Sequence, residues 1–222
     1  MTRAVAAFVL ALATAASAAD AWKIVRRTSI DGGEHEVQTE HWQRGRVMVD
    51  DPAQRTTVDF RAGTATVVDK ARGTTSRIEL EDLRRALVAI GALVDWLPPA
   101  ARDALGAGRT VTLASTGNFT TIAGHRAREY GVGGEGVTGW VWLAEDVDPR
   151  TILGDDASPW WRAGGPLRNV GPLGDVMRAI EAGHLRGMPV WAWLTIGSTD
   201  GTTTIATDVV SITKEQPPSA SE

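Results

Sequence analysis

The feature of this sequence that most constrains its fold is a series of short segments, rich in threonine and valine, in which apolar and polar residues alternate. A period of two is typical of β-strands, because successive side chains point to opposite faces of a sheet. Turn residues such as Asp31-Gly32-Gly33, Gly63 and Gly73 separate the segments, and such short turns join antiparallel neighbours. The strands predicted in this first part of the chain are 22–30, 34–42, 46–50, 56–60, 64–69 and 74–80.

The apolar period then changes to that of a helix. Apolar residues from Leu80 to Leu97 recur at three- and four-residue steps, which predicts an amphipathic helix that stops at Pro98-Pro99. A further helix is predicted from Pro172 to about Gly183, because proline suits the first helical position and glycine the end. The other predicted elements are strands 111–114, 120–132, 138–144, 188–196 and 202–213 and a helical turn at 149–153. This order of elements is typical of an antiparallel α+β fold.

The N-terminal residues predict export. Arg3 precedes an apolar run of about a dozen residues, and Ala16-Ser17-Ala18 fits the small-residue rule for cleavage after Ala18. The run is shorter than the roughly 20 residues that cross a bilayer. We therefore expect a signal peptide at 1–18, one domain at 19–213, a flexible polar tail at 214–222, and no transmembrane segment in the mature chain. A periplasmic or secreted location follows.

Cysteine content and charge exclude several classes of function. The chain has no cysteine, which excludes thiol catalysis, thiolate metal sites, disulfides and a lipid anchor at a lipobox cysteine. The formal charge of −4 becomes −5 when Arg3 is removed with the signal peptide. A mildly acidic chain without a basic stripe argues against nucleic acid and anionic membrane surfaces as partners.

One glycine motif resembles a nucleotide-binding fingerprint. The residues Gly131 to Gly136 satisfy G-x-G-x-x-G, but that fingerprint requires a helix after the glycines. The segment that follows, Thr138 to Ala144, alternates as a strand. We therefore interpret the glycines as a hairpin turn and expect no cofactor.

No metal site is predicted from the four histidines. His35 and His41 lie on one predicted strand, and six residues of strand separate their side chains by about 20 Å. Neighbouring glutamates indicate a solvated strand face. His184 follows the predicted end of a helix, where a histidine interacts favourably with the helix dipole.

No catalytic residues are predicted, and we expect a protein that is not an enzyme. The pairs Asp50-Asp51 and Asp155-Asp156 suit turns, although paired carboxylates also serve glycosidases and weak calcium loops. The chain has no G-x-S-x-G elbow, and neither Ser115 nor Ser158 has a recognisable base partner. A hydrolase stays a third alternative, which would need a histidine beside a carboxylate in a pocket.

Tryptophan spacing is the strongest physical signal. Tryptophan supplies nine of the thirteen aromatic residues. Trp140 and Trp142 share one face of a predicted strand, and Trp191 and Trp193 share one face of another. If these strands are neighbours, the four indoles form a ladder, because cross-strand side chains lie about 5 Å apart. The residues between them are also apolar, so one face must bury itself against another element or line a cavity.

Several segments resemble a family of exported bacterial domains of unknown function whose fold is similar to that of the lipoprotein carriers LolA and LolB. The segments are 121–125 (TIAGH), 130–132 (YGV), 139–144 (GWVWLA) and 187–190 (GMPV). The resemblance implies a strongly curved antiparallel sheet, an incomplete β-barrel, with helices covering its open side over a hydrophobic cavity. No residue aligns with the lid arginine of the carriers, and the resemblance implies no catalytic residue.

Two functional hypotheses follow. The first is a non-enzymatic exported protein that binds a lipid, acyl chain or lipoprotein in a half-barrel cavity. The second is a structural or interaction module of the cell envelope with a self-filled core, which contacts an envelope protein through Trp160 and Trp161. The residues expected to bind the apolar ligand are Trp140, Trp142, Trp191, Trp193, Leu87, Ile90 and Val94.

Overall fold

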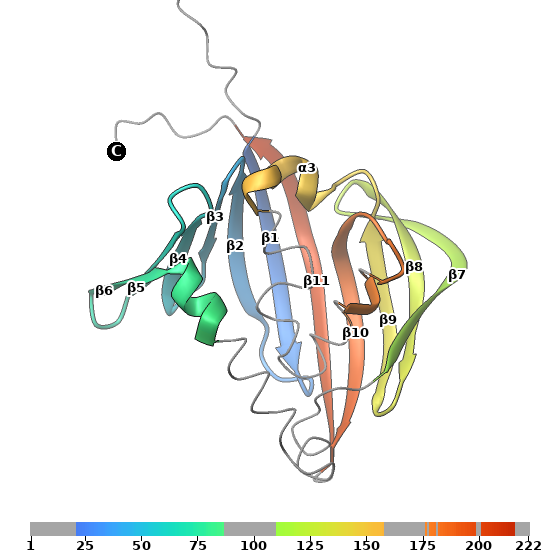
Figure 1. Cartoon of the computed structure of the whole chain (residues 1–222). Coiled ribbons are helices and arrows are strands. Elements are labelled where there is room, and N and C mark those ends of the chain that lie inside the picture. The colour runs from blue at the N-terminus through green and yellow to red at the C-terminus, as the bar shows by residue number, and fades with distance from the viewer. Residues whose placement is uncertain are drawn as a thin grey trace, which may run out of the picture.

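The structure is a computed structural model that describes residues 21–86, 110–157, 176, 178–180, 182–198 and 201–215. Its strands form one antiparallel sheet in the order β6-β5-β4-β3-β2-β1-β11-β10-β9-β8-β7 (Figure 1). The strands are β1 (Ala21–Ile30), β2 (Glu36–Gln43), β3 (Arg46–Asp50), β4 (Gln54–Asp59), β5 (Thr64–Asp69), β6 (Thr74–Glu79), β7 (Val111–Ile122), β8 (His125–Gly134), β9 (Val137–Ala144), β10 (Met188–Ser198) and β11 (Gly201–Glu215). Two short helices are α3 (Pro149–Leu153) and the 3-10 helix η1 (Asp155–Ala157). Residues 80–86, 176, 178–180 and 182 are also helical.

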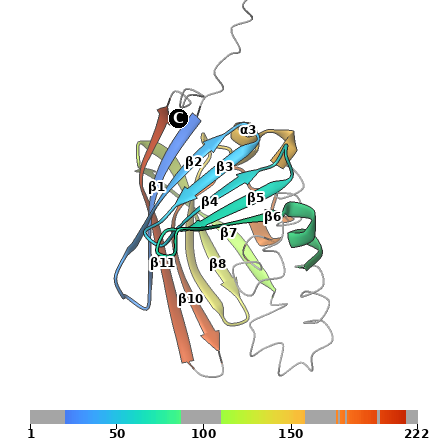
Figure 2. The ribbon, with the colours of Figure 1, turned by 90° about the vertical axis from the view of Figure 1, so that its left-hand side faces the viewer.

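The sheet is strongly curved and does not close into a barrel. Figures 1 and 2 show it wrapping around a concave side, with β6 and β7 at its two ends. The predicted antiparallel sheet, curved and incomplete as a barrel, is therefore confirmed. Helices that cover its open side stay a prediction, because only a small share of the described residues is helical.

The first six strands form a meander in which each strand pairs with the next along the chain. Two of its turns contain Gly63 and Gly73, whose φ angles are +67° and +64°. Glycine adopts this left-handed region at little cost because it has no Cβ. The predicted turns are thus where the structure has them, and β3 and β5 have the predicted bounds.

Two elements differ from the sequence-based prediction. The predicted strand 120–132 is divided by a turn at Ala123 and Gly124, with φ of +50° and +85°, so that Ile122 on β7 pairs with His125 on β8. Positive φ at both central residues matches the twist of a hairpin. Strand β11 continues to Glu215, and the sheet therefore includes the first two residues of the predicted tail.

The G-x-G-x-x-G glycines lie in a hairpin. Strand β8 ends at Gly134, and Gly136, with φ of +68°, follows in the turn that leads into β9. A strand therefore follows the glycines, as predicted, and no helix begins there to bind a pyrophosphate.

The hydrophobic core lies on the concave side of the sheet, where Figures 1 and 2 also place α3 and the helical residues near 180. One cluster packs Leu153 of α3 against Ile24, Met188 and Val190 of the sheet. A second cluster packs helical residues against β8, β9 and β10. Its buried members are Tyr130, Val132, Val137, Val141, Leu143, Val176, Ala192 and Leu194.

Candidate functional site

The four tryptophans lie together, as their spacing predicts. Strand β9 pairs with β10, and the register sets Trp142 opposite Trp191 and Trp140 opposite Trp193. The rings of Trp140 and Trp193 are stacked, with centroids 5.5 Å apart and planes inclined by 28°. The result is a two-by-two indole ladder, which we call the tryptophan ladder.

The tryptophan ladder lies on the outer face of the sheet. Val141, Leu143 and Leu194 are buried against the helical residues of the concave side, and alternation along the strands directs the indoles to the opposite face. Trp140 is 44% exposed. Trp142 is half-buried and packs against the first core cluster. A role of these tryptophans in ligand binding stays a proposal.

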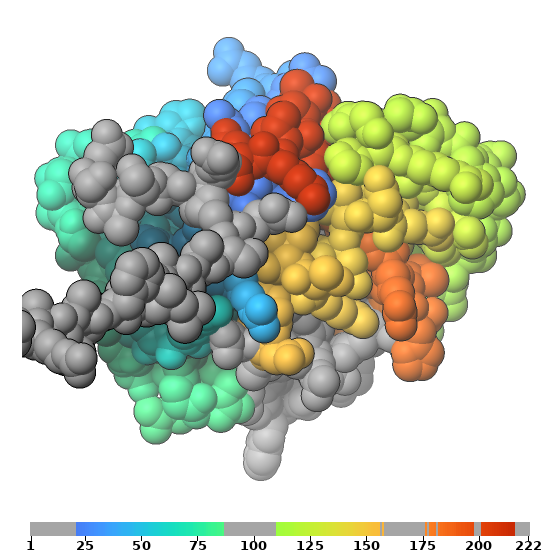
Figure 3. Space-filling view, turned by 90° about the horizontal axis from the view of Figure 1, so that it is seen from above, coloured from blue at the N-terminus to red at the C-terminus, as the bar shows by residue number. Residues whose placement is uncertain are grey.

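A pocket of about 340 Å³ lies at the rim of the concave side. It lies between the start of β1, the turn from β2 to β3, the end of β11, and α3 with the residues that precede it. Seen from above in Figure 3, the end of β11 lies beside the segment that contains α3. We call this site the rim pocket; its lining residues are Trp22, Arg44, Asp146, Val147, Asp148, Thr151, Ile152 and Lys214.

Local sequence signals position α3 at the rim pocket. Asp148 caps the helix by accepting a hydrogen bond from the Arg150 amide at 2.9 Å, and Pro149 occupies the first turn. Leu153 is fully buried, and its carbonyl accepts a hydrogen bond from the Gly45 amide at 2.8 Å. The helix is thus attached to both the core and the β2–β3 turn.

The rim pocket combines apolar and charged groups. Val147 is fully buried, and Trp22 and Ile152 pack against the same core cluster. The Lys214 ammonium lies 5.0 Å from the centroid of the Trp22 ring, within the range of a cation–π interaction. The Arg44 guanidinium makes no ion pair with the residues that the structure describes. A pocket lined by both apolar and basic side chains can bind an amphiphile whose polar end is anionic.

A histidine–carboxylate pair borders the rim pocket. His125 Nδ1 lies 2.9 Å from Asp146 Oδ2, and the His125 ring centroid lies 6.3 Å from that of Trp22. Such a pair, a histidine beside a carboxylate at a pocket, meets the condition set for the hydrolase alternative, because a carboxylate can orient an imidazole that acts as a base. No serine or threonine hydroxyl of the described residues hydrogen-bonds to His125. Among the described residues, the pair therefore has no hydroxyl nucleophile hydrogen-bonded to it.

Sequence reasoning missed a buried polar cluster on the concave face. The Glu40 carboxylate accepts hydrogen bonds from Arg26 Nε at 2.8 Å, Gln38 Nε2 at 2.8 Å and Trp42 Nε1 at 2.9 Å. The side chain of Glu40 is 6% exposed and that of Arg26 is 15% exposed. Arg26 also donates to the Pro189 carbonyl on β10 at 3.1 Å. The cluster connects β1 and β2 to β10, and an arrangement of five residues across three strands leaves no signal in sequence spacing.

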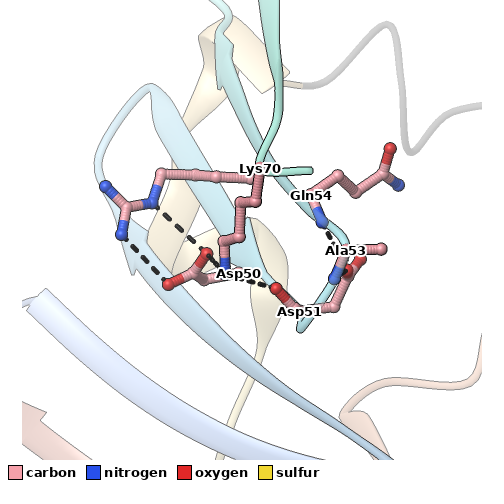
Figure 4. Close-up of polar contacts among 6 residues, drawn as sticks. Asp50, Asp51, Ala53, Gln54 and Lys70 are labelled. Atoms are coloured by element: carbon pink, nitrogen blue, oxygen red, sulfur yellow. Dashed lines mark hydrogen bonds and ion pairs between the residues drawn. The ribbon is translucent and has the colours of Figure 1, made fainter. Parts of the chain in front are cut away.

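The Asp50-Asp51 pair serves the structure of a turn (Figure 4). The Asp50 carboxylate binds Arg55 at 3.1 Å and Lys70 at 2.8 Å, and these hydrogen bonds hold the pKa of Asp50 below its ordinary value. Asp51 accepts from the amides of Ala53 and Gln54 at 2.8 and 2.7 Å. Both carboxylates are therefore occupied by local partners, as the turn interpretation predicts.

The structure also describes His41 on β2, His35 just before β2, and His184 after the helical residues near 180. His41 Nδ1 lies 3.3 Å from Glu215 Oε2, His35 is exposed, and His184 follows the helical residues with a φ of +50°. Within the described ranges, no three histidine, aspartate or glutamate side chains form a group suited to a metal ion.

Several predicted residues lie outside the described residues. They include the proposed helix contacts and the proposed surface tryptophans, as well as the signal peptide and Ser158. The site residues concerned are Leu87, Ile90, Val94, Trp160 and Trp161. Of the helices that the structure describes, none is both long enough and apolar enough to cross a membrane.

Comparisons with known proteins give structural similarities at low identity. No protein-family model matches the chain, and no curated protein sequence matches it. The chain is similar to PNGF-II, solved in space group C2, with 9% identity and a TM-score of 0.40 over 90% of this chain and 29% of that one. It is similar to MucB, with 11% identity and a TM-score of 0.37 over 90% of this chain and 55% of that one.

A third similarity is to the LolA superfamily protein NE2245 from Nitrosomonas europaea, with 10% identity and a TM-score of 0.29 over 90% of this chain and 87% of that one. The chain thus spans less than a third of PNGF-II and just over half of MucB. At these identities and TM-scores, the comparisons assign the chain to no family.

Proposed function

We propose that this protein is an exported, non-enzymatic binding protein that holds the acyl chain of a lipid or lipoprotein, with its anionic end at the rim pocket. The observation that carries the proposal is the composition of that pocket. Its lining combines the apolar side chains of Trp22, Val147 and Ile152 with the basic side chains of Arg44 and Lys214. The volume of about 340 Å³ is in the range of small-molecule sites.

The energetic argument has an apolar and a charged part. Each Å² of apolar ligand surface removed from water contributes roughly 25 cal/mol, and the indole and isoleucine side chains provide the apolar contact. The two carboxylates at the pocket have partners within the protein: Asp146 lies beside His125, and Asp148 caps α3. Because both carboxylates already have partners, the pocket favours a ligand with an anionic end over one with a cationic end.

The test is binding of laurate to the purified mature protein, followed by tryptophan fluorescence and native mass spectrometry. We expect laurate to bind, and we expect the variants Arg44→Gln and Lys214→Gln to bind laurate more weakly. Binding of dodecanol, which lacks the charge, should change little in these variants. Arg77→Gln on the exposed strand β6 is the matched control. Absence of any bound lipid after extraction, with no fluorescence change on adding laurate, would rule out the proposal.

A second candidate is a structural or interaction module of the cell envelope. It is favoured by the filled concave side near β9 and β10, where Leu143 and Val190 are fully buried against the protein's own residues. Trp160 and Trp161 are the proposed contacts with an envelope protein. A pull-down from envelope extract with the double variant Trp160→Ala and Trp161→Ala tests this candidate, since unchanged partners would contradict it.

The proposal includes export and a defined mature chain. We propose cleavage after Ala18, a single domain at 19–213 and a periplasmic or secreted location. Expression of the full chain in a Gram-negative host, followed by mass measurement of the protein in the periplasmic fraction, tests all three. A protein that retains residues 1–18 in the cytoplasmic fraction would contradict export.

A further inference from the structure

We infer that the outer face of β8 and β9 binds a carbohydrate chain of neutral or amino sugars, stacked on the indole of Trp140. Trp140 lies between two neighbours in its row across the sheet: Trp193 on β10 and Gly131 on β8. The Trp193 ring covers one side of the indole at 5.5 Å. On the other side the cross-strand neighbour has no side chain, and Trp140 is 44% exposed.

The space beside Trp140 continues along β8 and toward β7. Gly131 and Gly133 lie on the same face because they are two residues apart, and Ala114 on β7 is the cross-strand partner of Gly131. A Cβ placed on Gly131 would meet its nearest atoms at 3.9 Å, an ordinary contact distance. We call these two residues the glycine strip: a row beside the indole from which no side chain projects.

Polar groups stand at both ends of the glycine strip. At one end Glu129, opposite Trp142, has a carboxylate fixed by Thr116 Oγ1 and Asn118 Nδ2, both at 2.6 Å. At the other end Thr138 pairs with Gly133 across β9 and β8. The carboxylate is oriented by its neighbours and retains acceptor capacity, since a carboxylate has about four lone-pair sites.

This combination fits the chemistry of a sugar ring. A pyranose has an apolar face of C–H groups, which packs on an aromatic face, and a rim of hydroxyl groups, which donate to a carboxylate and exchange hydrogen bonds with threonine. The charges near the site favour some classes of sugar over others. Glu129 and Asp208 flank the tryptophan ladder, and Arg27, next to Asp208, is already paired with it at 2.6 Å. A polyanionic glycan would therefore meet repulsion, whereas a neutral or amino sugar would not.

The variant that tests the inference adds a side chain to the glycine strip. Gly131 lies in a strand without positive φ and has room for a Cβ, so Gly131→Val should fold normally while its methyl groups cover the free side of the Trp140 indole. Trp140→Ala removes the stacking surface itself. Thr57→Val, on the outer face of β4, is the matched control, and Arg44→Gln separates this site from the rim pocket.

The probes are cellohexaose, the hexamer of N-acetylglucosamine and hexagalacturonate, titrated by calorimetry. We expect one or both of the first two to bind, hexagalacturonate to bind least, and Gly131→Val and Trp140→Ala to weaken binding about tenfold, which corresponds to the loss of one aromatic contact. Thr57→Val and Arg44→Gln should bind as the unaltered protein does.

Three results would overturn the inference. They are no binding of either uncharged hexamer at millimolar concentration, equal binding by Gly131→Val, and strongest binding of the acidic hexamer. Light scattering on the same proteins tests a second copy of the chain as the occupant: a dimer that Gly131→Val dissociates would show self-association in place of carbohydrate binding.

Discussion

The two faces of β9 and β10 are both apolar, but their side chains are buried to different extents, and the larger side chains are not the more buried ones. The concave face carries smaller aliphatic residues, of which Val141 is 2% exposed and Leu143 is fully buried. The outer face carries larger indoles, and Trp140 there is 44% exposed. The largest apolar side chains of these strands are thus the less buried ones. Burial follows from what packs on a face, and among the described residues helical segments pack on the concave face.

The largest effect is expected for Glu40, the polar exception on the concave face. Glu40→Ala would remove the carboxylate to which Arg26 Nε and Trp42 Nε1 donate and would leave the Arg26 charge without its counter-ion. We expect a loss of about 3–5 kcal/mol in the free energy of unfolding, because an uncompensated buried charge is costly. Urea denaturation measures it, with Glu79→Ala on the exposed strand β6 as control. A loss no greater than that of the control would mean that Glu40 is not part of the core.

Removing aliphatic volume from the concave face should be the next most costly change. Leu143→Ala deletes a fully buried side chain, and we expect a loss of about 3 kcal/mol in the free energy of unfolding from lost transfer energy and the cavity left behind. Thermal and urea unfolding of the mature protein provide the value. If Trp140→Ala costs as much as Leu143→Ala, our assignment of the two faces is wrong.

Gly139 and Gly131 provide a further test, because the two glycines differ in the space available for a Cβ atom. A Cβ on Gly139 would lie 2.0 Å from the Trp193 carbonyl oxygen, and its φ is +148°, whereas a Cβ on Gly131 meets nothing closer than 3.9 Å. We expect Gly139→Ala to cost about 2 kcal/mol through overpacking and strain, and Gly131→Ala to leave stability unchanged or slightly raised. Melting temperatures of the two variants check this; similar values for both would contradict the predicted clash.

The tryptophan ladder should contribute little to stability. Trp140→Ala removes a half-exposed ring and its stacking on Trp193, and we expect a loss of about 1 kcal/mol. The near-ultraviolet circular dichroism of the stacked pair should change in Trp140→Ala and in Trp193→Phe, but not in Trp22→Phe. An unchanged spectrum in the first two variants would indicate that the indoles are not stacked in solution.

The smallest effect is expected on the charged part of the outer face. The hydrogen bonds from Arg55 and Lys70 hold the pKa of Asp50 below its ordinary 3.8, and this stabilisation is present above pH 3.8 and is lost as the pH falls through the folded-state value. Asp50→Asn should therefore cost about 0.5 kcal/mol at pH 7 and progressively less below pH 3.8. Urea unfolding at pH 7 and at a pH below 3.8 tests this prediction. A loss of stability in Asp50→Asn that does not depend on pH would exclude the ion pairs as its cause.

Much of the sheet was predictable from local pattern, and the departures have identifiable causes. Strand β3 and strand β5 have the predicted bounds because turn residues define their ends: Gly45 and Asp51-Pro52 for β3, and Gly63 and Gly73 for β5. The turn at Ala123-Gly124 was missed because alanine rarely adopts positive φ. The rim pocket was missed because Trp22, Arg44 and Lys214 come from three distant segments that meet only when β1 pairs with β11 and β2.

The sequence by itself determined most of the strands and most of their turns. It also determined that Trp140 and Trp142 share one face of a strand and that Trp191 and Trp193 share one face of another, because alternation and turn chemistry act between residues close in the chain. Only the tertiary structure decided that these two pairs meet, that they face outward, and that Glu40 lies buried beside Arg26. The physical reason is that both faces of β9 and β10 are apolar. Which of the two faces is buried depends on which elements pack against it, and strand alternation does not reveal which elements those are.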